Sequence, residues 1–350
     1  MPTVELVHEA KRQCLGGACT RVVSSPARSS NALSPAITRL STARPALVRG
    51  LHVAVMASSL RIGQVVKGFR DVYVVAQKLH DQVWSASNTA HRKVVLKCAP
   101  EIRLQREREI LQQFESNSCI RNFIDHGNEP PFLVLEHLEL GALKSSSERS
   151  FSRQDVKFIA HNVLSALASL HAKGIAHTDI KPDNILLNFN ASGTRVVDAK
   201  LADCAHAIGA AIFRSPEALL GLKWSTPTDI WSFGATLLSL IFGRNFHIFK
   251  PPKVSADDAE FPVHVLIQQA RYFGPFPLTY KSFLDEEQEK ILAAIHIHIE
   301  EQCIRKPFSQ VEDEELTPED KIFLCEIMRL DPRDRPTAKE LLKHDWFAIS

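Results

Sequence analysis

Three polar side chains that could carry out a phosphoryl transfer lie within six residues of one another. Residues 177–184 read His-Thr-Asp-Ile-Lys-Pro-Asp-Asn, so a carboxylate (Asp179), an ammonium (Lys181) and a carboxamide (Asn184) share one short segment. Phosphoryl transfer needs a base that orients the attacking hydroxyl, a cation near the moving phosphate and oxygen ligands for a metal ion. The segment therefore predicts a catalytic loop, although the same residues taken alone could form a polar turn.

Regular elements on both sides would hold this loop in place. Apolar residues recur at three- and four-residue spacing from Val156 to Leu170, after a cap-like start at Ser152 and before Gly174, which predicts a helix. Residues 185–187, Ile-Leu-Leu, read as a short buried strand. Catalytic side chains commonly lie on loops that such a scaffold positions.

The rest of the chain divides into a strand-rich part and a helical part, which predicts an α+β fold with two lobes. Residues 72–137 alternate as strands do and contain one charged helix, whereas the pattern from residue 152 onward is helical. The helix that begins at Thr226-Pro227 is apolar nearly all round, so we expect it to be buried. The expected strands are 72–75, 83–84, 94–97 and 132–135, the other expected helices begin near 102, 317 and 337, and 246–316 should contain helices joined by long loops.

Composition excludes several classes of protein. The chain has 350 residues, of which 45% are hydrophobic and 23% charged, as in ordinary globular proteins. None of the seven cysteines forms a CxxC pair, so neither a zinc site nor a disulfide framework is indicated. No apolar run approaches the roughly 20 residues of a membrane span. We expect an intracellular protein of the cytoplasm or nucleus that binds no membrane.

Charge is distributed unevenly along the chain. Residues 1–70 contain ten basic and two acidic residues and so carry +8, which leaves −6 on residues 71–350 because the whole chain carries +2. An acidic body does not predict nucleic-acid binding, but it would attract a basic protein substrate. The Arg- and Ser-rich residues 1–60 are either a disordered tail or a mitochondrial transit peptide. Glu5 and Glu9 speak against the transit peptide.

The order of the motifs resembles that of the eukaryotic protein kinases. Residues 177–184 resemble the catalytic loop of that family, and Asp203 lies where the family has the metal-binding Asp of Asp-Phe-Gly. Ser-Pro-Glu at 215–217 resembles the Ala-Pro-Glu that closes the activation segment, and residues 229–234 resemble the motif of the buried helix. Thr178 and the Phe-Arg-Ser-Pro-Glu segment at 213–217 resemble the SR-protein kinases of the CMGC group, and the Phe-Gly-Pro-Phe-Pro run at 273–277 lies where that group carries an insert.

The N-terminal half carries the matching nucleotide-binding motifs. Residues 94–97, Val-Val-Leu-Lys, resemble the Val-Ala-Ile-Lys strand, and Glu107 fits the helix glutamate that pairs with Lys97. Taken alone, Glu107 could equally be one charge in the solvated run 103–109. Residues 135–138 resemble the hinge, whose backbone would bind adenine.

The resemblance implies a role for each residue. Asp179 would accept the proton of the substrate hydroxyl, and Lys181 would neutralise charge on the transferred phosphoryl group. Asn184 and Asp203 would bind Mg²⁺. The implied ATP-binding residues are Lys97, Glu107, Val83, Val95, Glu136, Leu138 and Leu186. The implied structural charges are Glu217, Asp229 and Arg335, which must be paired if buried.

Four departures from the family pattern bear on activity: the missing glycines, the altered metal motif, an activation segment shortened to the 15 residues from Asp203 to Glu217, and the absence of the usual phosphorylation site. Residues 78–83 contain no glycine where the family has its Gly-rich loop, and the metal motif reads Asp203-Cys204-Ala205. No Thr or Tyr lies between Asp203 and Ser215, so we expect an enzyme that activation-segment phosphorylation does not switch.

The resemblance implies a monomeric ATP- and Mg²⁺-dependent serine/threonine protein kinase acting on a protein substrate, which the charge distribution suggests is basic and Arg/Ser-rich. The alternative is a pseudokinase that serves as a binding scaffold. We expect a tail at 1–70 and a kinase domain at 71–347, with an N-lobe at 71–138 and a C-lobe at 139–347.

Overall fold

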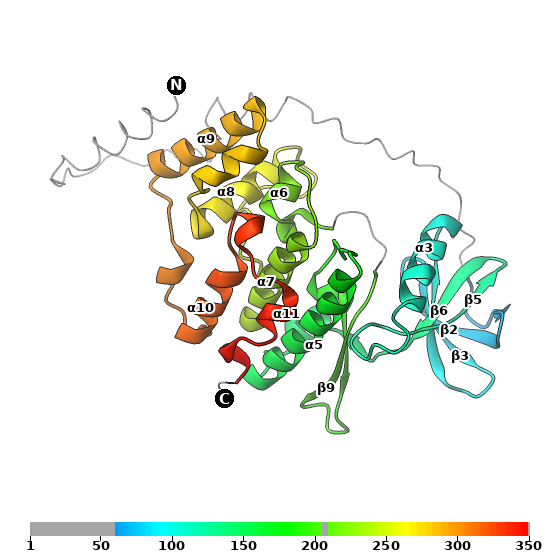
Figure 1. The fold of residues 1–350 in the computed structure, drawn as a ribbon. Coiled ribbons are helices and arrows are strands. Elements are labelled where there is room, and N and C mark those ends of the chain that lie inside the picture. The colour runs from blue at the N-terminus through cyan, green and yellow to red at the C-terminus, as the bar shows by residue number, and fades with distance from the viewer. Residues whose placement is uncertain (1–59, 205–208, 349–350) are drawn as a thin grey trace, which may run out of the picture. The chain divides into compact units, whose positions relative to one another are not determined.

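The computed structural model describes residues 60–204 and 209–348 (Figure 1). The expectations for the N-terminal tail up to residue 59 and for Ala205 lie outside these residues. Within the described part, no helix is long and apolar enough to cross a membrane.

The N-terminal part is an antiparallel sheet with one helix, as predicted (Figure 1). The strand order is β1-β2-β3-β4-β6-β5, and helix α3 (Glu101–Gln112) contacts β5 and β6. The strands are β1 (Val65–Lys67), β2 (Val72–His80), β3 (Val83–Asn88), β4 (Lys93–Cys98), β5 (Phe123–Asn128) and β6 (Pro131–Glu136). Alternate residues of these strands, including Tyr73, Leu96 and Phe132, are buried in one cluster, which is how an amphipathic sheet forms its core.

Strands β1 and β5 were not predicted from the sequence. Strand β1 has three residues and lies ahead of the expected domain boundary at residue 71. Strand β5 reads Phe-Ile-Asp-His-Gly-Asn, which looks like a polar loop. Its Asp125 is nevertheless 1% exposed, because the Tyr73 hydroxyl donates to it at 2.9 Å and the Arg70 amide at 2.9 Å. Because a buried polar residue with such partners interrupts the apolar alternation, the hydrophobicity pattern does not reveal the strand.

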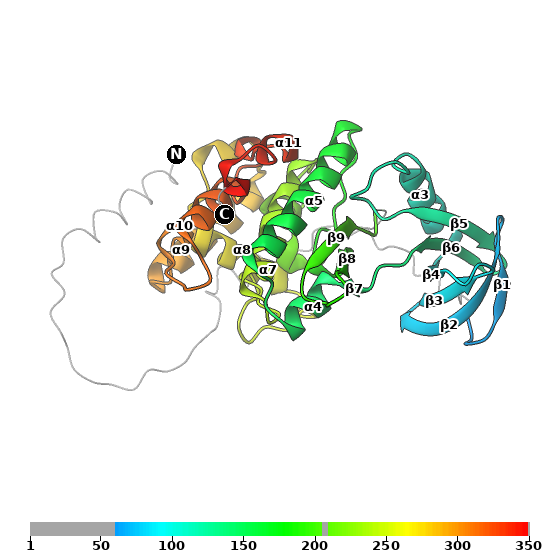
Figure 2. The ribbon, with the colours of Figure 1, turned by 90° about the horizontal axis from the view of Figure 1, so that it is seen from below.

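The C-terminal part is mainly helical, so the predicted α+β fold is confirmed. A small sheet of β7 (Leu140–Gly141), β8 (Ile185–Phe189) and β9 (Val196–Leu201) lies against α5 (Arg153–Ala172) (Figure 2). The remaining helices of the described part are α4 (Ala142–Glu148), α6 (Pro216–Leu219), α7 (Pro227–Phe242), α8 (Phe261–Phe273), α9 (Glu286–Glu301), α10 (Pro318–Ile327) and α11 (Ala338–Leu341).

Helix α7 is the buried helix that the sequence predicts. Every residue from Thr228 to Leu240 is buried, and the helix contacts α4, α5 and α10. The predicted start of α5 is also confirmed, because the Ser152 hydroxyl accepts a hydrogen bond from the Asp155 amide at 3.1 Å. Asp155 in turn accepts from the Val196 amide at 3.0 Å, which ties the start of α5 to β9.

Candidate active site

The predicted catalytic loop, residues 177–184, follows α5 and is held by a carboxylate from α7. The fully buried Asp229 accepts hydrogen bonds from the amides of His177 and Thr178, both at 2.7 Å, and contacts His171 Nε2 at 2.9 Å. Thr178 has a φ of 69°, which a β-branched residue rarely adopts. A strained backbone persists only where its surroundings fix it, and the hydrogen bonds to Asp229 help to fix it here.

The structure brings together the three residues of the predicted catalytic loop. The Asp179 side chain accepts from Lys181 Nζ at 2.9 Å and from Asn184 Nδ2 at 2.8 Å, and Asn184 Nδ2 also donates to the Asp179 carbonyl at 2.8 Å. Asp179 is 7% exposed. Because the carboxamide nitrogen is used on Asp179, the oxygen of Asn184 is the atom that remains to bind a metal ion.

A second cluster joins both parts of the chain. Lys97 Nζ on β4 lies 2.9 Å from Glu107 Oε2 on α3 and 2.5 Å from Asp203 Oδ1 after β9. Burial lowers the pKa of Lys97, but the carboxylates of Glu107 and Asp203 outweigh burial and raise it above its ordinary value. Glu107 is 3% exposed, so the alternative that it belongs to a solvated charge run is wrong.

Backbone hydrogen bonds link the two clusters. The Ala202 amide donates to the Asn184 carbonyl at 2.8 Å, and the Ala202 carbonyl contacts His177 Nε2 at 2.9 Å. Asp203 itself has a φ of 64°. His177 and Asn184, the two ends of the predicted catalytic loop, therefore hold Ala202, the residue before Asp203, in place.

The expected apolar and hinge residues lie on the expected elements. Val83 pairs with Lys97 across β3 and β4, and Val95 and Leu138 are buried. Leu186 lies on β8, where it pairs with Lys200 of β9.

Glu136 of the hinge has partners that the sequence did not predict. Its side chain accepts from Lys200 Nζ at 2.8 Å, and its backbone carbonyl accepts from Arg121 Nε at 2.8 Å. Neither basic residue belongs to a motif, so only the tertiary structure reveals them.

The place of the Gly-rich loop is taken by a two-residue turn. Strands β2 and β3 pair up to His80 and Val83, which leaves Asp81 and Gln82 as the turn. Gln82 has a φ of 62°, a conformation that glycine adopts without strain. A turn this short offers few backbone amides to a phosphate.

Gly209 lies directly against Asp179. The Gly209 amide donates to the Thr178 carbonyl at 3.1 Å, and Arg214 Nε donates to the Gly209 carbonyl at 2.5 Å. A Cβ atom at position 209 would overlap the Asp179 carboxylate. The sequence analysis did not single out this glycine, because the residue that it contacts, Asp179, lies 30 positions away in the sequence.

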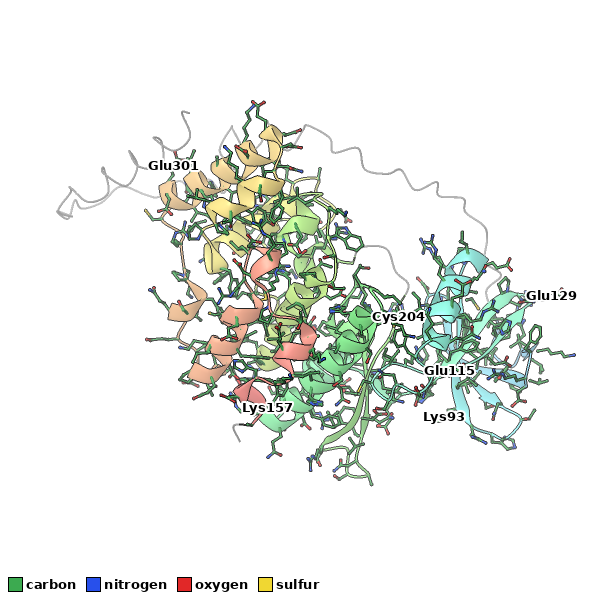
Figure 3. All side chains as sticks on the ribbon, in the orientation of Figure 1. Lys93, Glu115, Glu129, Lys157, Cys204 and Glu301 are labelled. Atoms are coloured by element: carbon green, nitrogen blue, oxygen red, sulfur yellow. The ribbon has the colours of Figure 1, made fainter. Side chains whose placement is uncertain are left out.

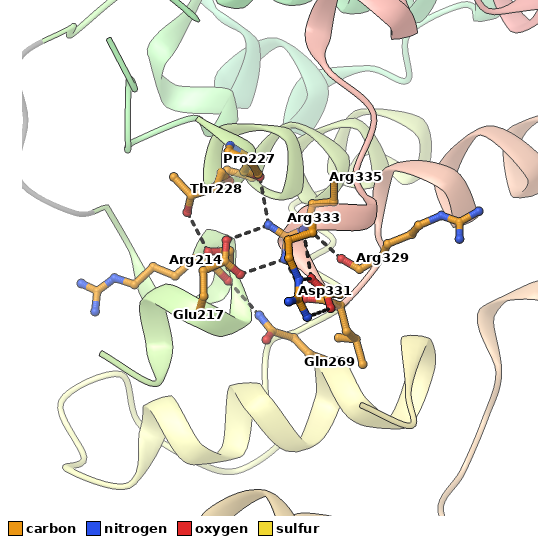
Figure 4. Close-up of polar contacts among 12 residues, drawn as sticks. Arg214, Glu217, Pro227, Thr228, Gln269, Arg329, Asp331, Arg333 and Arg335 are labelled. Atoms are coloured by element: carbon orange, nitrogen blue, oxygen red, sulfur yellow. Dashed lines mark hydrogen bonds and ion pairs between the residues drawn. The ribbon is translucent and has the colours of Figure 1, made fainter. Parts of the chain in front are cut away.

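The predicted partnership of Glu217 and Arg335 is confirmed (Figure 4). Arg335 donates to both carboxylate oxygens of Glu217, at 2.7 and 2.8 Å, and its side chain is completely buried. The carbonyls of Arg329, Pro227 and Leu330 accept its other N–H groups. This pair joins the end of the activation segment to the C-terminal elements.

Two cysteines adjoin the charged clusters. Cys98 follows Lys97 and Cys204 follows Asp203, where Figure 3 labels it. Burial raises the pKa of the Cys98 thiol to about 11 and that of Cys204 further. Both therefore remain neutral thiols at physiological pH.

Asn184 and Asp203 offer oxygen donors that fit Mg²⁺, which prefers oxygen ligands and retains water or phosphate in part of its shell. In the described residues no group of three or more His, Cys, Asp or Glu side chains forms a metal site. A metal held here would therefore share its coordination with bound phosphate or water.

A family model described as "Protein kinase domain" matches residues 62–347. The match covers most of the chain, so the chain belongs to the protein kinase family. Domains of this family transfer phosphoryl groups to proteins. The match begins nine residues before the boundary at residue 71 that the sequence analysis expected.

Proposed function

We propose that the chain is an ATP- and Mg²⁺-dependent serine/threonine protein kinase. The observation that carries this proposal is the Lys97–Glu107–Asp203 cluster, in which a lysine from β4 contacts one carboxylate from the neighbouring helix α3 and another from the distant segment after β9. This arrangement places the Lys97 ammonium beside Asp203, the residue expected to bind the metal ion. Most of the catalysis of phosphoryl transfer comes from positioning the reactants and stabilising charge.

The geometry supports one role in phosphoryl transfer for each polar group. Asp179 takes the proton of the attacking hydroxyl, and its hydrogen bond from Asn184 fixes the carboxylate for this task. Lys181, 2.9 Å from Asp179, neutralises negative charge on the transferred phosphoryl group. Asn184 and Asp203 would hold Mg²⁺, which would supply further compensation for phosphate charge. Lys97 holds the α- and β-phosphates while Glu107 keeps its ammonium in place.

For the substrate we propose a basic, Arg- and Ser-rich protein, in keeping with the resemblance to the SR-protein kinases. The charge of −6 on residues 71–350 supports this choice. A cavity of about 790 Å³ at the loop after α7 is lined by basic side chains and would not attract a basic protein. These side chains are those of Arg244, His247, Lys250 and Lys253. We therefore assign the basic substrate to surfaces other than this loop.

A pseudokinase that serves as a scaffold is the second candidate. The Asp81-Gln82 turn and the close approach of Gly209 to Asp179 favour it. Against it stands the presence of Lys97, Glu107, Asp179, Asn184 and Asp203 in two hydrogen-bonded clusters.

A turnover assay separates the two candidates. The purified chain is incubated with Mg²⁺, ATP and a basic Ser-rich protein, beside the Asp179→Asn variant. We expect phosphate on serine or threonine, with a rate at least about 10² lower in the variant because the base is removed. Equal incorporation by both proteins, or none by the wild type, would contradict the kinase. Phosphate on tyrosine would contradict the residue specificity alone.

The domain limits and the tail are part of the proposal. We propose that the kinase domain extends over residues 62–347, nine residues further than expected at its start, in keeping with the family match and with strand β1 of the N-terminal sheet, and that it acts as a monomer inside the cell. Mass spectrometry of the protein from cells tests the tail, because an intact Met1 contradicts a cleaved transit peptide.

A further inference from the structure

Lys200 lies on β9, three residues before Asp203, and its ammonium group reaches the hinge. Nζ donates to both carboxylate oxygens of Glu136, at 2.8 Å each. The Lys200 side chain is 9% exposed, and that of Glu136 is 27% exposed. Asp198 Oδ2 lies at 4.0 Å from the same nitrogen. The ion pair between Lys200 and Glu136 therefore joins the strand that leads to the expected metal ligand to the segment expected to bind the base.

The register of the small sheet places Lys200 beside the expected base site. Lys200 is directly opposite Leu186 in the antiparallel pair of β9 and β8. Side chains of directly opposite residues project from the same face of a sheet. Leu186 is one of the expected ATP-binding residues, and its strand begins immediately after Asn184. The Lys200 side chain thus shares a sheet face with Leu186 on its way to the hinge.

Glu136 is the residue through which the hinge is held. Its carboxylate also accepts from the Asn122 amide at 3.2 Å, and its own amide donates to the Asn122 carbonyl at 3.0 Å. Its carbonyl accepts from Arg121 Nε at 2.8 Å, and the Arg121 amide donates to the Leu201 carbonyl at 2.9 Å. The Glu136 carbonyl keeps a second lone pair, which remains for a donor of the base.

The separation between the hinge and Asp203 matters because both would bind the same small molecule. The covalent structure of ATP fixes how far its base can lie from its phosphates. Both ends are bound at once only if the protein holds the hinge and Asp203 at the matching separation. Lys200 precedes Asp203 by three residues, so its charge-assisted hydrogen bonds to Glu136 tie these two places together.

We propose that Lys200 is a positioning residue for the nucleotide, which holds the hinge through Glu136 at the separation from Asp203 that ATP requires. This inference rests on the proposed function, because it takes the backbone of residues 136–138 as the base site and Asp203 as a metal ligand. Lys200 itself contacts neither the transferred phosphoryl group nor the substrate hydroxyl.

Binding of ATP and of its two halves tests the proposal without requiring turnover. Calorimetry of the full chain measures the affinities of Mg²⁺–ATP, adenosine and Mg²⁺–tripolyphosphate for the wild type, Lys200→Met and Lys200→Arg, with the weaker ligands measured by competition with ATP. We expect Lys200→Met to bind ATP about tenfold more weakly, because a displacement of about 1 Å between two binding groups can cost up to roughly 10²-fold. Adenosine and tripolyphosphate should each bind as they do to the wild type, since each half of the site stays intact. Lys200→Arg, which keeps the cation and can donate to both carboxylate oxygens, should restore most of the ATP affinity.

Phosphate transfer gives a second readout of the same effect. In Lys200→Met the KM for ATP should rise about tenfold while kcat at saturating ATP stays near the wild-type value, because a lost positioning contact of this kind weakens binding without removing a transfer residue. A loss of kcat with unchanged KM would contradict the assigned role.

Two further variants separate positioning from general stability. Arg153→Met breaks the ion pair of Arg153 with the fully buried Asp320, 2.7 Å away, between α5 and α10. This control should lower the melting temperature and leave the ATP affinity unchanged. Glu136→Gln removes the charge from the other member of the pair and should weaken ATP binding in the same direction as Lys200→Met. The double variant Lys200→Met/Glu136→Gln should bind ATP as Lys200→Met does, because no ion pair then remains to be lost. If Lys200→Met fails to fold, the comparison of Glu136→Gln with Arg153→Met decides.

Other outcomes overturn the proposal in distinguishable ways. Wild-type ATP affinity in Lys200→Met refutes the positioning role and leaves the kinase intact. Adenosine affinity that falls as far as ATP affinity shows that Lys200 affects the base site alone. An equal loss of ATP affinity in Arg153→Met assigns the effect to stability. A loss confined to ATP, in a protein that transfers no phosphate, supports the role of Lys200 and refutes the kinase. If the wild type binds no nucleotide, both proposals fail.

Discussion

Lys97 and Asp203 are 106 positions apart in the sequence, yet Lys97 Nζ and Asp203 Oδ1 lie 2.5 Å from each other. The first lies on the N-terminal sheet and the second follows β9 of the C-terminal part. The contact therefore depends on the correct folding of both parts, and it provides the most direct test of the proposed nucleotide site.

Replacement of Lys97 by methionine should remove the cation that lies between the buried Glu107 carboxylate and the partly exposed Asp203 carboxylate. We expect kcat/KM to fall by about 10² to 10³, because one electrostatic group at a reacting centre contributes on that order. Steady-state phosphate transfer measures the change. Lys93→Met, at the exposed start of the same strand, is the control and should retain wild-type rates. A Lys97→Met enzyme as active as the control would remove Lys97 from the mechanism.

Gly209→Ala should impair catalysis without unfolding the protein. The added Cβ overlaps the Asp179 carboxylate, and the carboxylate or the segment around position 209 must move. A displacement of about 1 Å in a catalytic group can lower the rate roughly 10²-fold. Gly141→Ala is the matched control, because its nearest new contact is an ordinary one of 3.7 Å to the Asp183 carbonyl. The melting temperature should stay near that of the wild type in both variants, and unchanged kcat in Gly209→Ala would contradict the contact.

Arg335→Leu should strongly destabilise the C-terminal part. The change leaves the Glu217 carboxylate buried without its cation, and breaking a buried ion pair in this way costs about 3–5 kcal/mol. Chemical denaturation measures the loss. The double variant Glu217→Leu/Arg335→Leu should recover much of it, since neither charge then remains buried alone. Equal stability of the single and double variants would show that the charge pairing is not the source of the effect.

Asp320 should make the stability depend on pH in the acid range. Burial raises its pKa, but hydrogen bonds from Arg153, the Thr317 amide and Trp346 outweigh burial and hold the pKa below its ordinary 3.8. The unfolded state therefore binds the proton first, and the stability contributed by the carboxylate is complete above about pH 3.8 and lost as the pH falls through the lower folded value. The difference in unfolding free energy between wild type and Asp320→Asn should be constant near neutrality and shrink below about pH 4. A difference that grows on acidification would contradict this sign.

The sequence predicted the residues that belong to ordered motifs and missed those defined by tertiary contact. Asp179, Lys181 and Asn184 are close in sequence, so a short loop brings them together, and Glu107 lies one strand-to-helix connection from Lys97. Arg121 and Lys200 were missed, because a basic residue that belongs to no motif gives no sign of which carbonyl or carboxylate it will meet.

The same limit explains the errors in the fold. The periodicity of α5 and α7 predicted both helices, since their apolar residues face a core. Strand β5 was missed because Asp125 interrupts its apolar pattern, although Tyr73, 52 positions away, makes that aspartate a core residue. Gly209 was overlooked for a similar reason, as its neighbour Asp179 belongs to a different segment.

The hydrogen bonds from the His177 and Thr178 amides to Asp229 couple the predicted catalytic loop to the buried core of the C-terminal part. Asp229 belongs to the first turn of α7, whose following residues are buried without interruption. The strained φ of Thr178 would relax if that turn frayed, and the Asp179 backbone would change direction with it. We therefore expect heating to abolish activity together with the first turn of α7, and not by an earlier local loosening of Asp179.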